Sequence, residues 1–216
     1  MFDMLTGPRV GDRADRPALH QARVVLSHFA RHAERRFRIS ALAARPHSPG
    51  TSIRLVGPGS PLRRLYEWDG LTEFIRAALA LPVLYRDADP AGACSIMLYG
   101  QGDELGWHFD NSEFAVTLML RASEGGGSFE FVPRIRDTGD ERRDAVGRLL
   151  AGAGDGIMTM DGQPGTLALF AGRHSIHRVT AIQGKTPRVN AVLAYAQEPG
   201  HRLTPLNREL FYGQSS

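Results

Sequence analysis

Short apolar and β-branched segments dominate the chain from Cys94 onward. Clusters of Gly, Asn and Pro separate them, among them Gly100–Gly102, Gly125–Gly127 and Gly162–Gly165. Many short strands with turn signals at this spacing are typical of a β-sandwich or jelly roll rather than of alternating strands and helices. The pattern predicts strands at Ser95–Tyr99, Gly106–Phe109, Ala115–Arg121, Ser128–Val132, Thr166–Phe170, Val179–Ile182 and Val189–Ala196.

Apolar residues at helical spacing precede this region and predict helices at Leu19–Phe37 and Leu62–Ala80, the second ended by Pro82. A further short helix is expected at Asp140–Gly152, inserted between strands. We therefore expect an α+β fold, with N-terminal helices packed on a double-stranded β-helix, a jelly-roll variant. The expected organisation is one domain over 1–216: an irregular or helical cover at 1–60, a helical part at 61–93, the β core at 94–200 and a tail at 201–216.

Composition and charge reduce the number of protein classes to which this chain could belong. The hydrophobic fraction of 42% is ordinary for a globular protein, and no apolar run approaches the length of a membrane helix. The N-terminal residues carry no secretory pattern, and the single Cys94 argues against disulfides and a Cys-based zinc site. The net charge is +3, but the arginines are interleaved with acids, as in DERRD at 140–144. We expect a cytoplasmic protein with no membrane or nucleic-acid partner.

The segment Gly106-Trp107-His108-Phe109-Asp110-Asn111 contains the first candidate metal ligands. Residues two apart in a strand point to the same face and lie about 6.6 Å apart along the chain, so His108 and Asp110 can meet one metal ion. Two imidazoles and one carboxylate form the facial triad of iron(II) oxygenases, which leaves coordination positions open for a bidentate co-substrate and O2. An H-x-D tripeptide alone is also compatible with a surface strand. His174 and His177, further along the chain, supply candidates for the third ligand.

Arg188 lies in the apolar segment RVNAVLAYA, eleven residues after His177. An arginine directed into a β-barrel is costly unless it meets an anion, and its planar guanidinium suits a bidentate contact with a carboxylate. Pairing with a protein carboxylate would meet that need. A dicarboxylate such as 2-oxoglutarate would also meet it, with one end on iron and the other on Arg188.

The order H-x-D, His, then Arg resembles the iron(II)/2-oxoglutarate-dependent dioxygenases. The stretches GQGDELGWHFDNSEFAVTLMLRASEGGGSFEFVP and PGTLALFAGRHSIHRVTAIQGKTPRVNAVLAYA resemble the branch of bacterial free-amino-acid halogenases and their hydroxylase relatives. The resemblance implies His108, Asp110 and His177 as ligands, because His177 has the family's spacing to Arg188. Halogenases of this branch have Gly where the carboxylate ligand would be, so Asp110 implies hydroxylation.

Further site residues follow from their positions. Asn190 shares a strand face with Arg188, and Tyr99 and Ser95 lie on the strand that leads to the metal motif, so all three are candidate co-substrate contacts. Candidate substrate contacts are Trp107, Asn111, Glu113 and His174. The alternatives are a buried core indole for Trp107, a surface charge at a strand end for Glu113 and a polar residue near the mouth of the site for His174.

The expected reaction is hydroxylation of an unactivated C–H bond of a small polar substrate, by branch resemblance a free amino acid or a derivative, with Fe(II), 2-oxoglutarate and O2 and with release of succinate and CO2. Two alternatives stay open. Arg188-Val189-Asn190 matches the start of the R-x-N-x-T-x-R signature of oxidative nucleobase dealkylases, although Val192 and Ala194 occupy its later Thr and Arg positions. A non-enzymatic jelly-roll protein with a structural metal is the other, but a structural zinc site would need four ligands and only three are visible.

Overall fold

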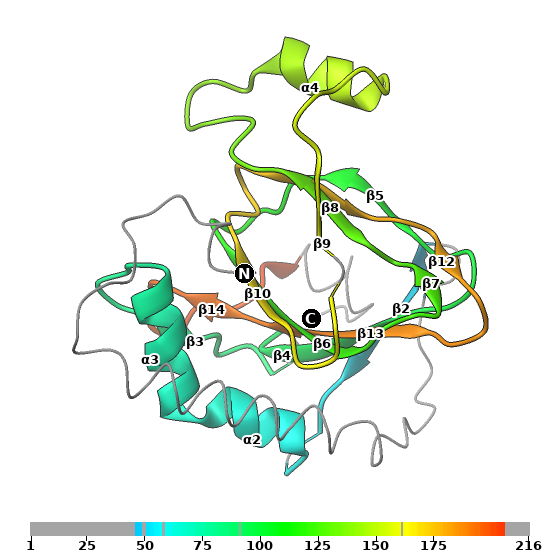
Figure 1. Cartoon of the computed structure of the whole chain (residues 1–216). Coiled ribbons are helices and arrows are strands. Elements are labelled where there is room, and N and C mark those ends of the chain that lie inside the picture. The colour runs from blue at the N-terminus through cyan, green and yellow to red at the C-terminus, as the bar shows by residue number, and fades with distance from the viewer. Residues whose placement is uncertain (1–45, 49–50, 58, 91, 161, 206–216) are drawn as a thin grey trace.

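Two antiparallel sheets face each other in the computed structural model, which describes residues 46–48, 51–57, 59–90, 92–160 and 162–205 (Figure 1). The larger sheet has the order β1 (Pro46–Ser48), β2 (Thr51–Leu55), β4 (Cys94–Tyr99), β13 (Arg188–Leu193), β6 (Ala115–Arg121) and β10 (Leu167–Phe170). The smaller sheet has the order β5 (Leu105–His108), β11 (Ile176–Val179), β8 (Phe129–Val132) and β9 (Met158–Met160). Two short pairs join β12 (Ile182–Gln183) to β7 (Gly125–Gly126) and β14 (Tyr195–Ala196) to β3 (Tyr85–Arg86). The expected double-stranded β-helix core is confirmed.

The main hydrophobic core lies between the larger sheet and the helices α2 (Pro61–Glu67) and α3 (Asp69–Ala78). Alternation along the central strand β13 produces this arrangement, because Val189, Ala191 and Leu193 face the helices while the residues between them face the smaller sheet. Leu71 and Ile75 of α3 are completely buried in this core. Burying an aliphatic side chain of this size contributes about 1.5–3 kcal/mol, so the helix face and the sheet stabilise each other.

The segment predicted as one helix, Leu62–Ala80, forms two. Trp68 adopts an extended conformation (φ −73°, ψ 119°) that ends α2 and precedes α3. Its indole lies where a Cβ on Gly70 would be, and glycine is a weak helix former. The break leaves both apolar faces on the sheet, and this is why periodicity alone did not reveal it.

Other boundaries also differ from the sequence prediction. The strand expected at Val179–Ile182 instead runs over Ile176–Val179 and includes His177, and a separate β12 follows. The hairpin of β1 and β2 extends the larger sheet where an irregular or helical cover was expected, and β2 pairs with β4. Pairing partners distant in the sequence determine such strands, so the local pattern is a weak guide to them. The strands β3 and β9 were also not predicted.

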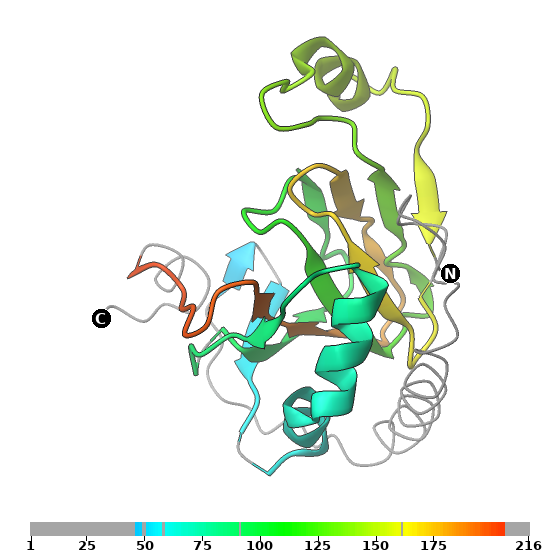
Figure 2. The ribbon, with the colours of Figure 1, turned by 90° about the vertical axis from the view of Figure 1, so that its left-hand side faces the viewer.

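Between β8 and β9, residues 133–157 leave the smaller sheet and form an excursion. It carries α4 (Arg143–Leu150), which lies inside the predicted helix at 140–152. Figures 1 and 2 show α4 standing away from the two sheets. The helix predicted at Leu19–Phe37 and most of the predicted tail lie outside the described residues. In the part of the chain that the structure describes, no helix has the length and apolar character needed to span a bilayer.

Candidate metal centre and co-substrate site

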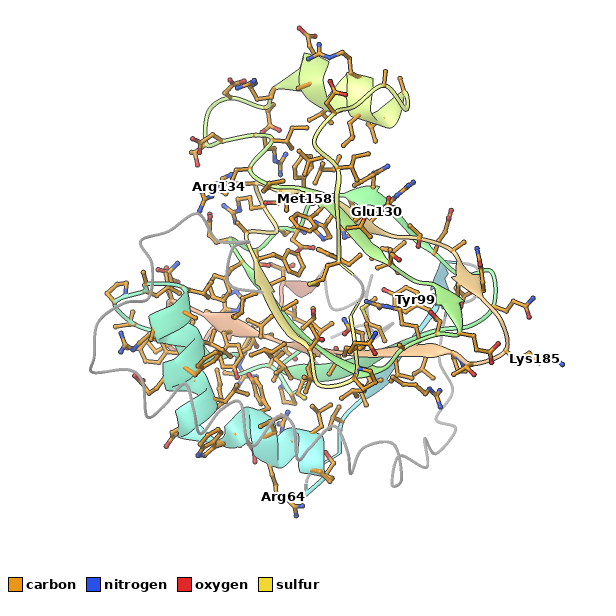
Figure 3. The ribbon with its side chains drawn as sticks, in the orientation of Figure 1. Arg64, Tyr99, Glu130, Arg134, Met158 and Lys185 are labelled. Atoms are coloured by element: carbon orange, nitrogen blue, oxygen red, sulfur yellow. The ribbon has the colours of Figure 1, made fainter. Side chains whose placement is uncertain are left out.

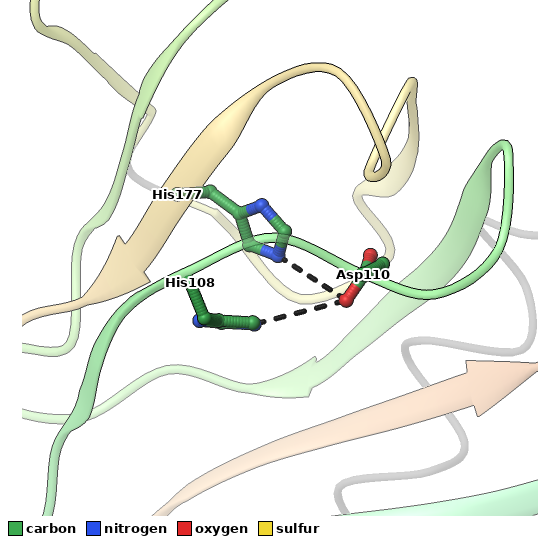
Figure 4. Close-up of side chains that lie close together, drawn as sticks. All are labelled: His108, Asp110 and His177. Carbon is green, nitrogen blue, oxygen red and sulfur yellow. Dashed lines mark ion pairs between the residues drawn. The ribbon is translucent and has the colours of Figure 1, made fainter. Parts of the chain in front are cut away.

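His108, Asp110 and His177 converge at one end of the smaller sheet (Figure 4). His108 is the last residue of β5 and pairs in register with His177 of β11, while Asp110 lies two residues beyond the end of β5. The Nε2 atoms of His108 and His177 lie 3.7 and 3.5 Å from Oδ1 of Asp110. One ligand atom from each of the three residues lies within 4.8 Å of the others, a spacing that one metal ion can bridge.

Backbone carbonyls orient both imidazole rings. Nδ1 of His108 lies 2.8 Å from the carbonyl oxygen of Gly106, and Nδ1 of His177 lies 2.8 Å from that of Ser175. A carbonyl oxygen only accepts hydrogen bonds, so each Nδ1 carries a proton, and the neutral form of each ring has its lone pair on Nε2. Such outer hydrogen bonds fix the tautomer of metal-binding histidines. Both rings therefore present a free Nε2 toward Asp110.

Gly172 makes room for the carboxylate of Asp110. A Cβ at position 172 would collide with Oδ2 of Asp110 and lie 2.7 Å from its Cγ. The backbone N–H of Asp110 also donates to the carbonyl oxygen of Gly172 at 3.1 Å. The carboxylate of Asp110 thus packs directly against the backbone of Gly172.

Aromatic side chains enclose the second imidazole. The rings of Phe129 and Phe170 lie 5.5 and 4.9 Å from the ring of His177, which is buried. Burial, followed by the neighbouring His177, lowers the pKa of His108 below its usual value. The lowered pKa favours the neutral imidazole, which is the form that binds a metal. Two neutral imidazoles and a carboxylate are the donor set of the non-haem iron(II) facial triad, so the residues fit iron(II).

Arg188 is a buried cation on the face of β13 that points toward the smaller sheet. Its side chain is 4% exposed, its Nε atom has no hydrogen-bond partner, and no ion pair within the described residues includes it. Its guanidinium lies 5.3 Å from the ring of Tyr99, and its Cδ would lie 3.0 Å from a Cβ on Gly127. Burial lowers the pKa of Arg188. A buried guanidinium in this state needs an anion, and the distal carboxylate of 2-oxoglutarate is an anion of the required kind.

The other predicted co-substrate contacts share this inner face. Arg188 pairs with Tyr99 across β13 and β4, and Asn190 and Ser95 lie at alternate positions on the same two strands. All four side chains are buried, and Figure 3 shows Tyr99 between the two sheets. Burial raises the pKa of Tyr99 to about 12, so its hydroxyl stays protonated and can donate a hydrogen bond.

Trp107 lies on the opposite face of β5 from His108. The guanidinium of Arg178 lies 4.7 Å from the Trp107 ring and is paired with Glu130 at 2.7 Å. Arg178 follows the inward-facing His177 and therefore points to the outer face. This position does not support the expectation that Trp107 contacts the substrate.

Asn111 and Glu113 follow Asp110 in the chain, and their contacts with Arg173 and His174 connect two segments. The carboxylate of Glu113 pairs with Arg173 at 2.8 Å and with Nε2 of His174 at 3.2 Å. Arg173 also donates to the carbonyl oxygen of Asn111. The segment after the H-x-D motif is thereby tied to the segment that leads to His177. His174 does not belong to the group formed by His108, Asp110 and His177.

Sequence reasoning missed several residues that shape the site. Gly172 and Gly127 provide space for Asp110 and Arg188, and Ser175 orients His177 through its carbonyl oxygen. Glycines in loops are too common to be singled out, and a backbone carbonyl leaves no signal in residue type. Arg136 of the excursion, whose guanidinium lies 3.7 Å from the Phe109 ring, could not be connected to the site from the sequence.

Comparisons with known proteins bear on the fold and the family of this chain. A search of curated proteins gave no match. The structure of HygX from Streptomyces hygroscopicus with nickel and 2-oxoglutarate bound is 16% identical, with 87% of this chain and 84% of that chain covered and a TM-score of 0.59. A 2OG-Fe(II) oxygenase family oxidoreductase from Burkholderia pseudomallei is 16% identical over 82% and 79% of the two chains, with a TM-score of 0.54. The epimerase SnoN, described as non-haem and α-ketoglutarate-dependent, is 15% identical over 81% and 74%, with a TM-score of 0.56.

At these identities the matches establish the fold. The family model HalD, described as halogenase D, matches residues 15–209, which is most of the chain. The chain therefore belongs to the halogenase D family and has the fold of the Fe(II)/2-oxoglutarate oxygenases.

Proposed function

We propose that this protein is an Fe(II)/2-oxoglutarate-dependent oxygenase that hydroxylates a C–H bond of a small polar substrate, a free amino acid or a close derivative. The observation that carries the proposal is the convergence of His108, Asp110 and His177 on one point, with both Nε2 atoms directed at the carboxylate. Arg188, a buried cation whose Nε atom lacks a partner, supplies the second requirement, a contact for an organic acid.

Hydroxylation is proposed over halogenation because Asp110 supplies a carboxylate in the metal group. In a halogenase of the resembling branch, a glycine at this position leaves room for chloride. Here Asp110 fills that position, and Gly172 provides the space for its Oδ2. The match to the HalD model therefore gives the family of the chain, while the ligand set His108, Asp110 and His177 favours hydroxylation over halogenation.

In this proposal each residue has a distinct task. His108, Asp110 and His177 hold iron(II), and Ser175 and Gly106 keep the two imidazoles in the ligating tautomer. The bound iron with 2-oxoglutarate and O2 supplies the oxidation, with succinate and CO2 as co-products.

The residues on the inner face of the larger sheet hold the co-substrate. Arg188 receives the distal carboxylate, and Tyr99, Asn190 and Ser95 are its buried polar neighbours on β4 and β13. Phe129 and Phe170 keep water away from the second imidazole, which protects a reactive centre from side reactions.

The family supports the proposed substrate class, since the branch that the sequence resembles acts on free amino acids. Asn111, Glu113 and His174 are candidate substrate contacts, because they belong to the two segments that carry Asp110 and His177 and are joined by the contact of Glu113 with His174. Their polarity suits a charged substrate better than an apolar one.

A substrate screen tests the proposal. Succinate release should be stimulated by one or a few compounds in a panel of free amino acids and derivatives, and not by methylated DNA, with Asp110→Ala as the inactive control. Stimulation by methylated DNA alone would replace this proposal with an oxidative dealkylase. In Asp110→Gly with chloride, hydroxylation should be lost, and unchanged hydroxylation would mean that Asp110 does not bind iron.

A further inference from the structure

The excursion between β8 and β9 contacts both chain segments that carry the metal group. The guanidinium of Arg136 lies 3.7 Å from the ring centroid of Phe109, the residue between His108 and Asp110. Its Nε donates to the carbonyl oxygen of Arg173 at 2.7 Å, and its backbone N–H donates to that of His174 at 3.3 Å. One arginine thus joins the H-x-D motif to the segment that leads to His177.

A second contact from the same excursion reaches the residue that orients His177. The backbone N–H of Arg134 donates to Oγ of Ser175 at 3.1 Å, and the carbonyl oxygen of Ser175 receives the proton of His177 Nδ1 at 2.8 Å. Ser175 is buried, and Figure 3 shows Arg134 at the base of the excursion. The excursion therefore reaches the metal group from two directions, through Phe109 and through Ser175.

Arg136 is itself held in place. Its Nη1 forms an ion pair with Glu141 at 2.7 Å, and its side chain is 21% exposed. A guanidinium over an aromatic face contributes about 0.5–1 kcal/mol at exposed sites and about 2 kcal/mol or more when it is desolvated. With Glu141 on one side and the Arg173 carbonyl on another, the planar group is fixed above the Phe109 ring rather than free to leave it.

We infer that Arg136 is a positioning residue for the metal centre, acting through Phe109 and the backbone at 173–175 on the placement of His108, Asp110 and His177. The inference rests on the proposed metal site. The excursion then has a role in the reaction, because removing the Arg136 side chain removes contacts to both of the segments that carry the metal ligands. Residues that orient metal ligands typically change metal affinity or activity about 10–100-fold when they are replaced.

The test is anaerobic titration with Co(II) as the metal probe, followed by its visible absorption. Arg136→Ala should bind Co(II) at least about 10-fold more weakly than the unaltered protein. Arg136→Lys should recover part of the loss, since it keeps the charge but lacks the planar fork. Arg148→Ala is the matched control, because it removes an exposed arginine of the same excursion, and its titration should be unchanged.

Two further readouts separate positioning from general destabilisation. Phe109→Leu and Arg136→Ala should be strongly non-additive in Co(II) affinity, as expected for two residues that act through one contact. Hydrogen exchange at 133–142 should slow when Co(II) and 2-oxoglutarate are added, because coupling between two sites is reciprocal.

Equal Co(II) affinity in Arg136→Ala and the unaltered protein would overturn the inference while leaving the metal site intact. If Arg136→Ala does not fold, Arg136→Lys and Phe109→Leu decide the question by the same titration. Failure of the unaltered protein to bind Co(II) would instead contradict the proposed function.

Discussion

Replacing Gly172 with alanine tests the seating of Asp110 with a single methyl group. The new Cβ would lie 2.7 Å from Cγ of Asp110, and closer still to Oδ2, whereas ordinary contact begins at 3.4 Å, so the carboxylate must retreat by at least about 0.7 Å. The backbone cannot easily relieve the overlap, because the Asp110 N–H donates to the carbonyl oxygen of Gly172. A displacement of this size exceeds the roughly 0.2 Å tolerance of a metal–ligand distance. We expect Asp110 to lose its ligand position in Gly172→Ala.

The expected result is a fall of about 100-fold in kcat/KM for succinate release, the usual consequence of misplacing a reacting group by about 1 Å. Anaerobic Co(II) titration should show weaker metal binding, and thermal unfolding should show that the fold is kept. Gly147→Ala is the matched control: a Cβ there meets nothing within 4 Å, and alanine stabilises a helix by about 0.5–1 kcal/mol relative to glycine.

A double variant shows whether the effect passes through Asp110. In an Asp110→Gly background the methyl group at position 172 has no carboxylate to displace, so adding Gly172→Ala should leave Co(II) affinity unchanged. Unaltered metal binding in Gly172→Ala alone, or a full effect in the Asp110→Gly background, would refute the reasoning.

Three further predictions follow from the surroundings of single side chains. Arg188→Met removes a buried cation, so the melting temperature of the variant without ligand should be higher than that of the unaltered protein. At 100 times its Kd, 2-oxoglutarate should stabilise the unaltered protein by about 2.7 kcal/mol and should not stabilise the variant. Stabilisation of the variant by 2-oxoglutarate would contradict this role of Arg188. Trp107→Leu should lose about 0.5–1 kcal/mol of stability and keep its KM values, and a raised substrate KM would return Trp107 to the site. Ile75→Ala should lower the free energy of unfolding in urea by about 2–5 kcal/mol without changing the Co(II) affinity, and a loss below 1 kcal/mol would mean that α3 is poorly packed.

The β core and the convergence of His108 and Asp110 could be predicted from strand periodicity, whereas His177 was assigned by its spacing to Arg188 in the family that the sequence resembles. His108 and Asp110 share a face as residues two apart in an extended chain, and the register between β5 and β11 brings His177 opposite His108. Arg188 could be singled out as a candidate co-substrate contact because a charged residue in an apolar strand needs a physical reason. Each of these inferences uses residue type and spacing, which the sequence contains.

The features that escaped prediction depend on tertiary contacts. The break at Trp68 preserves the apolar face of both helices, so the periodicity is the same with one helix or two. The strand β2 of the β1–β2 hairpin is specified by pairing with β4, 40 to 46 residues away in the sequence. Trp107 was considered both as a substrate contact, because it adjoins a ligand, and as a buried core indole, although strand alternation places neighbours on opposite faces. Applying that rule to Trp107 would have predicted its outward position.

The central claim is that three side chains hold one ferrous ion beside a bound 2-oxo acid, and the absorption spectrum of the anaerobic complex tests it most directly. Addition of Fe(II) and 2-oxoglutarate to the unaltered protein should produce a weak visible charge-transfer band, and the same addition to His177→Ala should produce none. A band of equal strength in both proteins, or no band in the unaltered protein, would contradict the account.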